Sequence, residues 1–224
     1  MKTTYANLRI NILGAKGVGK SAITVRYLTK RFIGEYSSGL DISYQTTVTH
    51  GDLPIKVDIL DVSSQDECQA SCHDLYDADG FVVVYSVTDT ESFKVAQKEV
   101  QTIRSRTPPH TPILLLGNKL DLDHARKVCK DDVCQLKSSY DCLHTEVSAA
   151  ESHVMVVSQL QALMVQTLSA LCQKGRPIKR RKSLFENMSK KLGSVFRRRS
   201  LEDTPHTKKK LMRVSHHHIN RRSV

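Results

Sequence analysis

The octapeptide GAKGVGKS, which runs from Gly14 to Ser21, carries more information than any other part of this sequence. It matches the pattern G-x-x-x-x-G-K-[ST], in which glycines let backbone N–H groups close around phosphate oxygens. In this pattern Lys20 reaches the terminal phosphates of a nucleotide, and the Ser21 hydroxyl ligates Mg²⁺. The mostly apolar run Ile10–Leu13 before it predicts a strand, and the residues after it suit the start of a helix. A helix N-terminus in that position points unpaired N–H groups at an anion, so we expect a phosphate site.

The charge of the chain is divided unevenly along its length. The 224 residues carry a net charge of +11, yet residues 174–224 alone hold 17 Lys and Arg against 3 Asp and Glu. The residues before them hold 17 basic and 20 acidic side chains and are therefore slightly acidic. We expect a folded domain over residues 7–173, followed by a basic and largely disordered tail over residues 174–224.

Six cysteines are present, and they are Cys68, Cys72, Cys129, Cys134, Cys142 and Cys172. Their spacing lacks the second ligand pair of a zinc site, and no apolar signal peptide precedes them. A nucleotide-binding domain implies the cytosol, where thiols stay reduced. We therefore expect ordinary thiols in a cytoplasmic protein, and no apolar run long enough to span a membrane.

Strand-like and helix-like segments alternate along the chain. Besides Ile10–Leu13, short apolar or β-branched runs predict strands at residues 45–49, 54–60, 81–87, 113–116 and 142–147. Apolar residues at helical spacing predict helices over Phe93–Ile103 and around Val133–Lys137. One further stripe predicts a last helix, with Val154, Val157, Leu160, Met164, Leu168 and Leu171 in the core. We expect an α/β fold of the P-loop NTPase type, in three α/β/α layers around a mostly parallel six-stranded sheet with one antiparallel edge strand.

Asp61 stands at the end of the strand predicted at residues 54–60. Open α/β sheets bind their ligands where strands end, and an acid beside a phosphate loop can hold the Mg²⁺ shell through water. Without the phosphate loop, an aspartate after a strand is ordinarily a helix cap or a turn residue. Because GAKGVGKS is present, we interpret Asp61 as a metal-site residue.

The segment Asn118-Lys119-Leu120-Asp121 follows the strand predicted at residues 113–116. The Asp121 carboxylate can accept two N–H groups from the edge of guanine, whereas adenine presents a lone pair at the same place. Lys119 would pack its stem over the base, and the small residues at Ser148 and Ala149 would give a backbone N–H to the guanine carbonyl oxygen. By itself the tetrapeptide also fits a surface turn, but together with GAKGVGKS it predicts a guanine-nucleotide site.

With these motifs the chain resembles the Ras superfamily of small GTPases from about residue 7 to residue 173. GAKGVGKSAITVRYLTKRF resembles the family's phosphate loop and first helix, ILDVSSQ its D-T-A-G-Q motif, GNKLD its base-reading motif and VSAA its S-A-K motif. The nearest branch is that of the Ras-related oestrogen-regulated growth inhibitor and its "-like" relatives, which lack a prenylation box. The resemblance implies a monomer that binds GDP and GTP with Mg²⁺, hydrolyses GTP slowly and signals in growth regulation.

The resemblance also assigns roles to individual residues. Gln65 would orient the attacking water and Lys20 would neutralise phosphate charge, while Ser21 and Asp61 would hold Mg²⁺. The nucleotide contacts are expected from Gly14, Ala15, Lys16, Gly17, Val18, Gly19, Lys20, Ser21, Ala22, Phe32, Asn118, Lys119, Asp121, Ser148, Ala149 and Ala150. Among them, Phe32 occupies the position whose ring stacks on guanine.

The chain departs from the family where the family responds to the γ-phosphate. Gly39 stands in place of a threonine that binds Mg²⁺ and the γ-phosphate, and Ser38 beside it can substitute only if the loop slips. Ser64 replaces a glycine whose N–H senses the γ-phosphate. Each hydrogen bond lost to a charged group is worth about 1.5–3 kcal/mol, a factor of roughly ten to a hundred in nucleotide preference. Two hypotheses stay open: a slow cycling GTPase that uses Gln65, and a nucleotide-bound scaffold that no longer cycles.

Lys16 and Ile42 bear on the regulators of such a protein. Ras has glycine at the position of Lys16, and a side chain there obstructs the arginine of an activating protein, which supplies roughly 10³–10⁵ in rate. Lys16 either points to solvent and blocks access, which we expect, or lies toward the γ-phosphate as a substitute cation. Ile42 replaces an acid, so Ras effectors are not expected, and the effector, exchange and activating proteins stay unknown.

The basic tail suggests a second kind of partner. Residues 184–197 place apolar side chains on one face of a predicted helix between basic clusters, which is typical of segments that bind an anionic membrane or calmodulin. Since there is no lipid-accepting cysteine at the end, binding at the inner face of the plasma membrane would be reversible. Lys179–Lys182 also fits a nuclear-import signal, and Ser183 and Ser200 fit basophilic kinase sites. The alternative is a solvated tail without a partner; nucleic acid is not expected, because stacking aromatics are scarce.

Overall fold

The computed structural model describes residues 6–36, 41–50, 53–62 and 75–173. The chain divides into two units, Met1–Arg181 and Lys182–Val224, and every described residue lies in the first. The expectations for Ser38, Gly39, Ser64, Gln65 and the basic tail concern residues outside these ranges. The division into a domain over 7–173 and a tail over 174–224 therefore stays a prediction.

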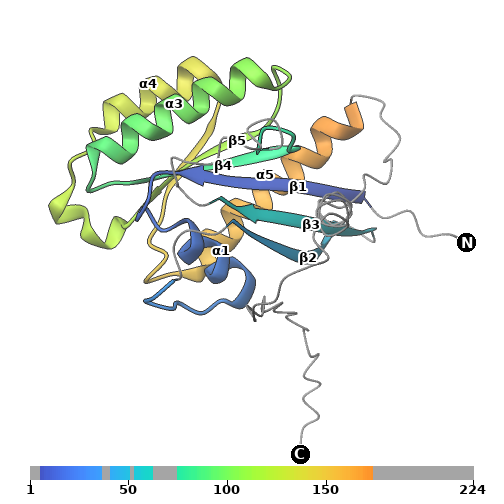
Figure 1. Cartoon of the computed structure of the whole chain (residues 1–224), viewed down its shortest axis with the longest axis horizontal. Coiled ribbons are helices and arrows are strands. Elements are labelled where there is room, and N and C mark those ends of the chain that lie inside the picture. Colours follow the sequence, from blue (N-terminus) through green and yellow to red (C-terminus); the bar gives the residue numbers. More distant parts are fainter. Residues whose placement is uncertain (1–5, 37–40, 51–52, 63–74, 174–224) are drawn as a thin grey trace, which may run out of the picture. The chain divides into compact units, whose positions relative to one another are not determined.

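A six-stranded sheet forms the centre of the domain (Figure 1). Its strands are β1 (Ala6–Gly14), β2 (Ile42–His50), β3 (Leu53–Asp61), β4 (Gly80–Ser86), β5 (Ile113–Asn118) and β6 (Leu143–Glu146). Their order in space is β2-β3-β1-β4-β5-β6. The edge strand β2 pairs antiparallel with β3, and the other neighbouring strands of this sheet pair in parallel. This confirms the predicted sheet, including its one antiparallel edge strand.

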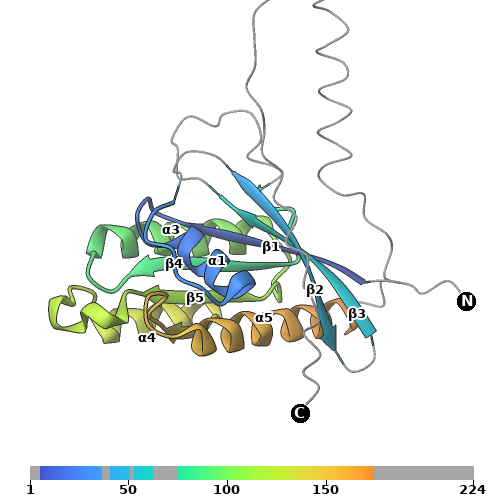
Figure 2. The same ribbon diagram turned by 90° about the horizontal axis from the view of Figure 1, so that it is seen from below.

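Helices cover both faces of the sheet, as Figures 1 and 2 show. The described helices are α1 (Lys20–Thr29), α3 (Thr90–Arg106), α4 (Lys130–Tyr140), α5 (His153–Gln173) and the short 3₁₀ helix η1 (Leu120–Ala125). The side chains of α1 and α5 join one buried cluster, and those of α3 and α4 join another on the opposite face. The three-layer α/β/α arrangement predicted from the sequence is therefore confirmed.

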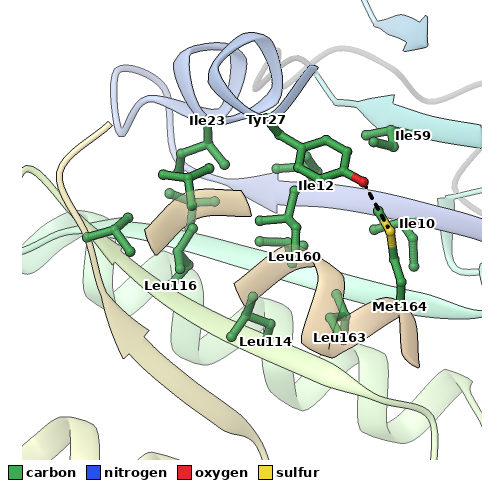
Figure 3. Close-up of a cluster of buried hydrophobic side chains, with 14 of the residues drawn as sticks. Ile10, Ile12, Ile23, Tyr27, Ile59, Leu114, Leu116, Leu160, Leu163 and Met164 are labelled. Carbon is green, nitrogen blue, oxygen red and sulfur yellow. Dashed lines mark hydrogen bonds between the residues drawn. The ribbon is translucent and has the colours of Figure 1, made fainter. Parts of the chain in front are cut away.

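Alternating side chains along the strands separate the two buried clusters. Ile10 and Ile12 of β1 point to the face covered by α1 and α5 (Figure 3). In that cluster the Tyr27 hydroxyl of α1 contacts the Met164 sulfur of α5 at 3.5 Å. β4 contributes alternate residues to both clusters and is buried along its whole length. A strand covered on both faces needs apolar residues at every position, which explains the continuous run Phe81–Val84.

The topology brings the sequence-predicted residues to one edge of the sheet. The chain crosses from β3 on one side of β1 to β4 on the other, so the loop after β1 lies where the strand order reverses. GAKGVGKS forms that loop, Asp61 ends β3, Asn118 ends β5 and Ser148 follows β6. Parallel strands place their carboxyl ends at the same edge, and ligands of open α/β sheets bind there.

α5 differs from its prediction in the face that it buries. Val154 was expected in the core but is 60% exposed. The fully buried positions of α5 are Val156, Leu160, Leu163, Met164 and Thr167. The predicted stripe is wrong at its start because α5 contains no Asp, Glu, Lys or Arg. Without charges to mark the outer face, hydrophobic periodicity fits more than one rotation of the helix.

The same composition makes α5 long and apolar enough to cross a membrane, with a mean hydropathy of 1.5 over His153–Cys172. The expectation that no apolar run has this length is therefore wrong by length and composition. The buried residues of α5 nevertheless pack against the sheet, so the helix serves as a core element of the domain.

Replacement of Leu160 by alanine should destabilise the domain far more than replacement of Val154. Leu160 is fully buried, and a buried leucine-to-alanine change costs about 2–5 kcal/mol in the free energy of unfolding. Val154→Ala is the matched control on the same helix and should stay within about 0.5 kcal/mol of the parent. Urea unfolding at saturating GDP measures both variants, and equal losses would contradict the observed rotation of α5.

Candidate nucleotide-binding site

The backbone of the phosphate loop depends on glycine at three positions. Gly14, Gly17 and Gly19 have φ angles of 137°, 79° and 98°, which side chains with a Cβ rarely adopt. A Cβ at Gly14 would collide with the carbonyl oxygen of Val84, and a Cβ at Gly19 would collide with the side-chain amide of Asn118. Gly19 is also the N-cap of α1, so no capping side chain covers the first turn of this helix, whose N–H end attracts anions.

Lys20 lies folded back over this loop. Its Nζ atom donates hydrogen bonds to the carbonyl oxygens of Gly14 at 2.8 Å and Ala15 at 2.9 Å, and the residue is 7% exposed. Burial lowers the pKa of Lys20, and the negative charges of Asp61, Glu99 and Asp41 oppose that shift. A desolvated ammonium held at the mouth of a glycine loop is suited to phosphate oxygens, because the attraction between charges is stronger away from water.

Asp61 and Ser21 form a pair of oxygen donors beside the loop. Asp61 is 3% exposed, and burial raises the pKa of its carboxyl group. A hydrogen bond with the Ser21 side chain and the charge of Lys20 oppose that rise. Hydroxyl and carboxylate oxygens are the ligands that Mg²⁺ prefers, and a cation would offset the cost of the buried carboxylate. The residues present therefore fit the predicted magnesium site.

Asn118 joins the loop after β1 to the loop after β6. It is 4% exposed, its Nδ2 donates to the Val18 carbonyl at 2.9 Å, and its Oδ1 accepts from the Ala149 N–H at 3.1 Å. The N–H of Ala149, which the sequence assigned to the guanine carbonyl oxygen, thus already has a partner within the protein. Ala150, the next predicted contact, is exposed.

Asp121 lies in the first turn of η1 and meets Ser148. The Ser148 hydroxyl donates to Asp121 Oδ1 at 2.6 Å and accepts from the Glu151 N–H at 3.1 Å. Lys119 adopts a left-handed conformation with φ of 66° directly before η1 and so turns the chain from β5 into this loop. One oxygen of Asp121 is thereby fixed by Ser148 while the residue stays exposed, as a group that pairs with a base edge must be.

The loops after β5 and β6, which carry Asp121 and Ser148, are the base loops of this site. Two residues beside them were missed by the sequence reasoning. Arg126, just after η1, binds both carboxylate oxygens of Glu146 at the end of β6, with Nη1 to Oε1 at 2.8 Å and Nη2 to Oε2 at 2.7 Å. The hydrogen bonds from Arg126 lower the pKa of Glu146. This pair ties the segment that carries Asp121 to the segment that carries Ser148. No local pattern reveals it, because the partners lie 20 residues apart.

The remaining predicted contacts fall in different settings. Val18 and Ala22 are buried in the core, so only their backbone can face a nucleotide. Lys16 is exposed, as the solvent-facing interpretation of its side chain requires. Phe32 lies shortly after α1 and is 45% exposed, and its stacking on guanine stays a prediction. Gln65 lies outside the described residues.

A strand, a glycine-rich phosphate loop, a helix N-terminus and two joined base loops define a P-loop nucleotide-binding protein. A model of the Ras family matches residues 9–169. The "Ras-related and estrogen-regulated growth inhibitor-like protein" of Bos taurus is 34% identical over 201 residues, or 86% of this chain and 97% of that protein. The "Ras-related and estrogen-regulated growth inhibitor" of Homo sapiens is 38% identical over 150 residues, or 64% of this chain and 73% of that protein. The "GTP-binding protein Rit1" of Mus musculus is 32% identical over 199 residues, or 85% of this chain and 88% of that protein.

This chain belongs to the Ras family, which confirms the resemblance inferred from its motifs. Its relatives place it in the branch of the Ras-related and estrogen-regulated growth inhibitor. Membership of this family makes it a GTP-binding protein of Ras type, and members of the family generally hydrolyse GTP and bind guanine nucleotide with Mg²⁺.

Gly19→Ala should lower the affinity for GDP by at least about tenfold. The left-handed backbone costs about 1–2 kcal/mol with a Cβ, and losing the Asn118–Val18 hydrogen bond adds about 1–3 kcal/mol. Gly34→Ala is the control, since a Cβ at Gly34 meets nothing within 4 Å. Titration with fluorescent GDP and Mg²⁺ measures both, and equal affinities for the two variants would refute the collision with Asn118.

Proposed function

We propose that this chain is a Ras-type switch that exchanges GDP and GTP, hydrolyses GTP slowly and responds little to activating proteins that supply an arginine. The observation that carries the proposal is the gathering of three groups at the strand ends. They are the Lys20 ammonium, the Ser21–Asp61 pair and the base loops joined by the hydrogen bond between Ser148 and Asp121. These groups match, in turn, the phosphates, the metal and the base of one guanine nucleotide.

The residues of the site divide the work of hydrolysis between them. Lys20 exchanges the carbonyls of Gly14 and Ala15 for phosphate oxygens and stabilises their charge. Ser21 and Asp61 hold Mg²⁺, which neutralises phosphate charge when it is bound. Gln65 orients the attacking water, as the family resemblance implies.

The departures at the γ-phosphate weaken the response of the chain to GTP. Gly39 has no hydroxyl to hold the metal and the γ-phosphate, and Ser64 narrows the backbone conformations that present its N–H. Each contact is worth a factor of roughly ten to a hundred, so their loss weakens the ordering of the switch loops by GTP. Lys16 is exposed on the phosphate loop, at the position where a side chain obstructs the arginine of an activating protein in Ras.

Single-turnover hydrolysis of bound GTP tests this proposal. We expect Gln65→Leu to slow hydrolysis about tenfold or more, because water is no longer oriented. A Ras-type activating protein should stimulate the parent far less than the roughly 10³–10⁵ typical of Ras. Lys16→Gly should recover part of that stimulation, while Lys98→Ala on the exposed face of α3 serves as a control that leaves it unchanged. A large stimulation of GTP hydrolysis in the parent by the activating protein would contradict the proposal.

The second candidate function is a scaffold that stays bound to nucleotide and does not cycle. Gly39 and Ser64 favour it, because both remove or alter contacts that sense the γ-phosphate. It predicts that Gln65→Leu hydrolyses GTP as fast as the parent. The same single-turnover measurement therefore separates the two functions.

We further propose that the basic tail places the protein reversibly at the inner, anionic face of the plasma membrane, from a cytoplasmic pool. The tail holds 17 Lys and Arg against 3 Asp and Glu, and each basic residue near an anionic surface contributes about 1 kcal/mol. Phosphorylation of Ser183 or Ser200 would add negative charge beside the basic clusters and weaken binding. Calmodulin and nuclear-import receptors are competing partners for the same clusters.

Pelleting with vesicles checks the tail. The full chain should sediment with phosphatidylserine vesicles at low salt and be released at about 0.5 M salt, because screening shortens the range of the attraction. Ser183→Glu/Ser200→Glu should bind more weakly, and Ser183→Ala/Ser200→Ala is the uncharged control. Binding to calmodulin with no binding to anionic vesicles would favour the competing partner.

A further inference from the structure

Arg26 is a buried cation on the inner face of α1. The residue is 9% exposed and shares its face of α1 with Ala22, Ile23 and Tyr27, which belong to the hydrophobic core. Its guanidinium group donates to three backbone carbonyls, those of Lys30 at 3.2 Å, Ala150 at 3.2 Å and Glu151 at 2.9 Å. Lys30 caps α1 two residues before Phe32, and Ala150 and Glu151 continue the loop after β6. Arg26 thus joins the two segments that flank the expected base site.

The carbonyl held by Arg26 belongs to a relay of hydrogen bonds that ends at Asp121. The Ala150–Glu151 peptide accepts from Arg26 through its carbonyl and donates through the Glu151 N–H to the Ser148 hydroxyl at 3.1 Å. The Ser148 hydroxyl in turn donates to Asp121 Oδ1 at 2.6 Å. Bonds in such a chain polarise one another, so the guanidinium charge strengthens the bond on the Asp121 carboxylate.

The next peptide, Glu151–Ser152, is also held between Arg26 and Ser148. The Glu151 carbonyl accepts from Arg26, and the N–H of the same peptide, that of Ser152, donates to the Ser148 carbonyl at 3.2 Å. Both peptides therefore turn their carbonyls to Arg26 and their N–H groups to Ser148. The position and orientation of Ser148 follow from the position of the guanidinium group.

Packing alone does not account for an arginine at this position. Its Nε atom is buried and has no hydrogen-bond partner among the described residues. An unsatisfied buried donor is costly, and an apolar side chain of similar length would fill the same space without that cost. What an arginine adds at this position is the set of hydrogen bonds from its guanidinium group to the loop after β6.

We propose that Arg26 is a positioning residue for guanine recognition. It fixes Ser148, and through Ser148 the Asp121 carboxylate, in the orientation that reads the N–H groups of the base, and it thereby slows nucleotide release. The inference rests on the proposed guanine site, in which Asp121 accepts from N1–H and from the 2-amino group. Inosine diphosphate lacks the 2-amino group and so reports on that contact separately from the phosphates.

The experiment measures the dissociation rates of GDP and inosine diphosphate from the full-length chain and from Arg26→Met. We expect GDP to leave Arg26→Met about tenfold faster or more, and the preference for GDP over inosine diphosphate to fall about fivefold or more. Arg26→Lys keeps the charge and a donor and should recover part of the preference. In Arg26→Met/Ser148→Ala the preference should fall no further than in Ser148→Ala, because the relay passes through Ser148.

Arg104→Met is the matched control. Arg104 also donates to three backbone carbonyls, those of Tyr140, Thr111 and Asp141, but it joins α3 to the end of α4 and to the segment before β5. The Arg104→Met variant should have a lower melting temperature than the parent and the same preference for GDP over inosine diphosphate. If Arg26→Met releases both nucleotides equally faster, or if the double variant shows additive losses, the positioning role is overturned. A parent chain without preference for GDP over inosine diphosphate would overturn the guanine site itself, and the inference with it.

Discussion

The two hydrogen bonds of the Asn118 side chain hold the nucleotide site together, since they join the phosphate loop to the loop after β6. They also explain a requirement at Gly19, where a Cβ would occupy the space of the amide. Because Asn118 ends β5 and is almost completely buried, the hydrophobic sheet fixes its position. Rigid strands thereby determine where flexible backbone loops can meet a ligand.

The charges of the site are arranged to be completed by a ligand. Lys20 and Asp61 are both buried. Burial lowers the pKa of Lys20 and raises the pKa of Asp61, so it favours the neutral form of each side chain. Their mutual attraction opposes both shifts, but each keeps a desolvated charge beside a loop of N–H groups. Phosphate oxygens would balance the charge of Lys20, and a magnesium ion would balance that of Asp61. The pairing of these desolvated charges would contribute to the free energy of nucleotide binding.

In the proposed function, nucleotide binding and nucleotide switching depend on different parts of this chain. The phosphate loop, the Ser21–Asp61 pair and the base loops agree with the Ras family pattern in sequence and come together in the described structure. The departures Gly39 and Ser64 fall on segments that respond to the γ-phosphate in the family. The proposed function therefore keeps binding to guanine nucleotide while it weakens the signal that binding produces.

Local patterns were sufficient for the strands, most helical faces and the three nucleotide motifs, because these depend on residues close together in the chain. Hydrophobic periodicity was wrong at Val154, because α5 carries no Asp, Glu, Lys or Arg to mark its outer face and the pattern fits more than one rotation of the helix. It could mark Arg26 as a polar residue on a buried face, but it could not show what Arg26 binds. That partner lies 124 residues away, as Val18 lies 100 residues from Asn118, and only the folding of the sheet brings such residues into contact. The motifs therefore come from the amino-acid sequence itself, whereas the relay that positions them exists only in the folded chain.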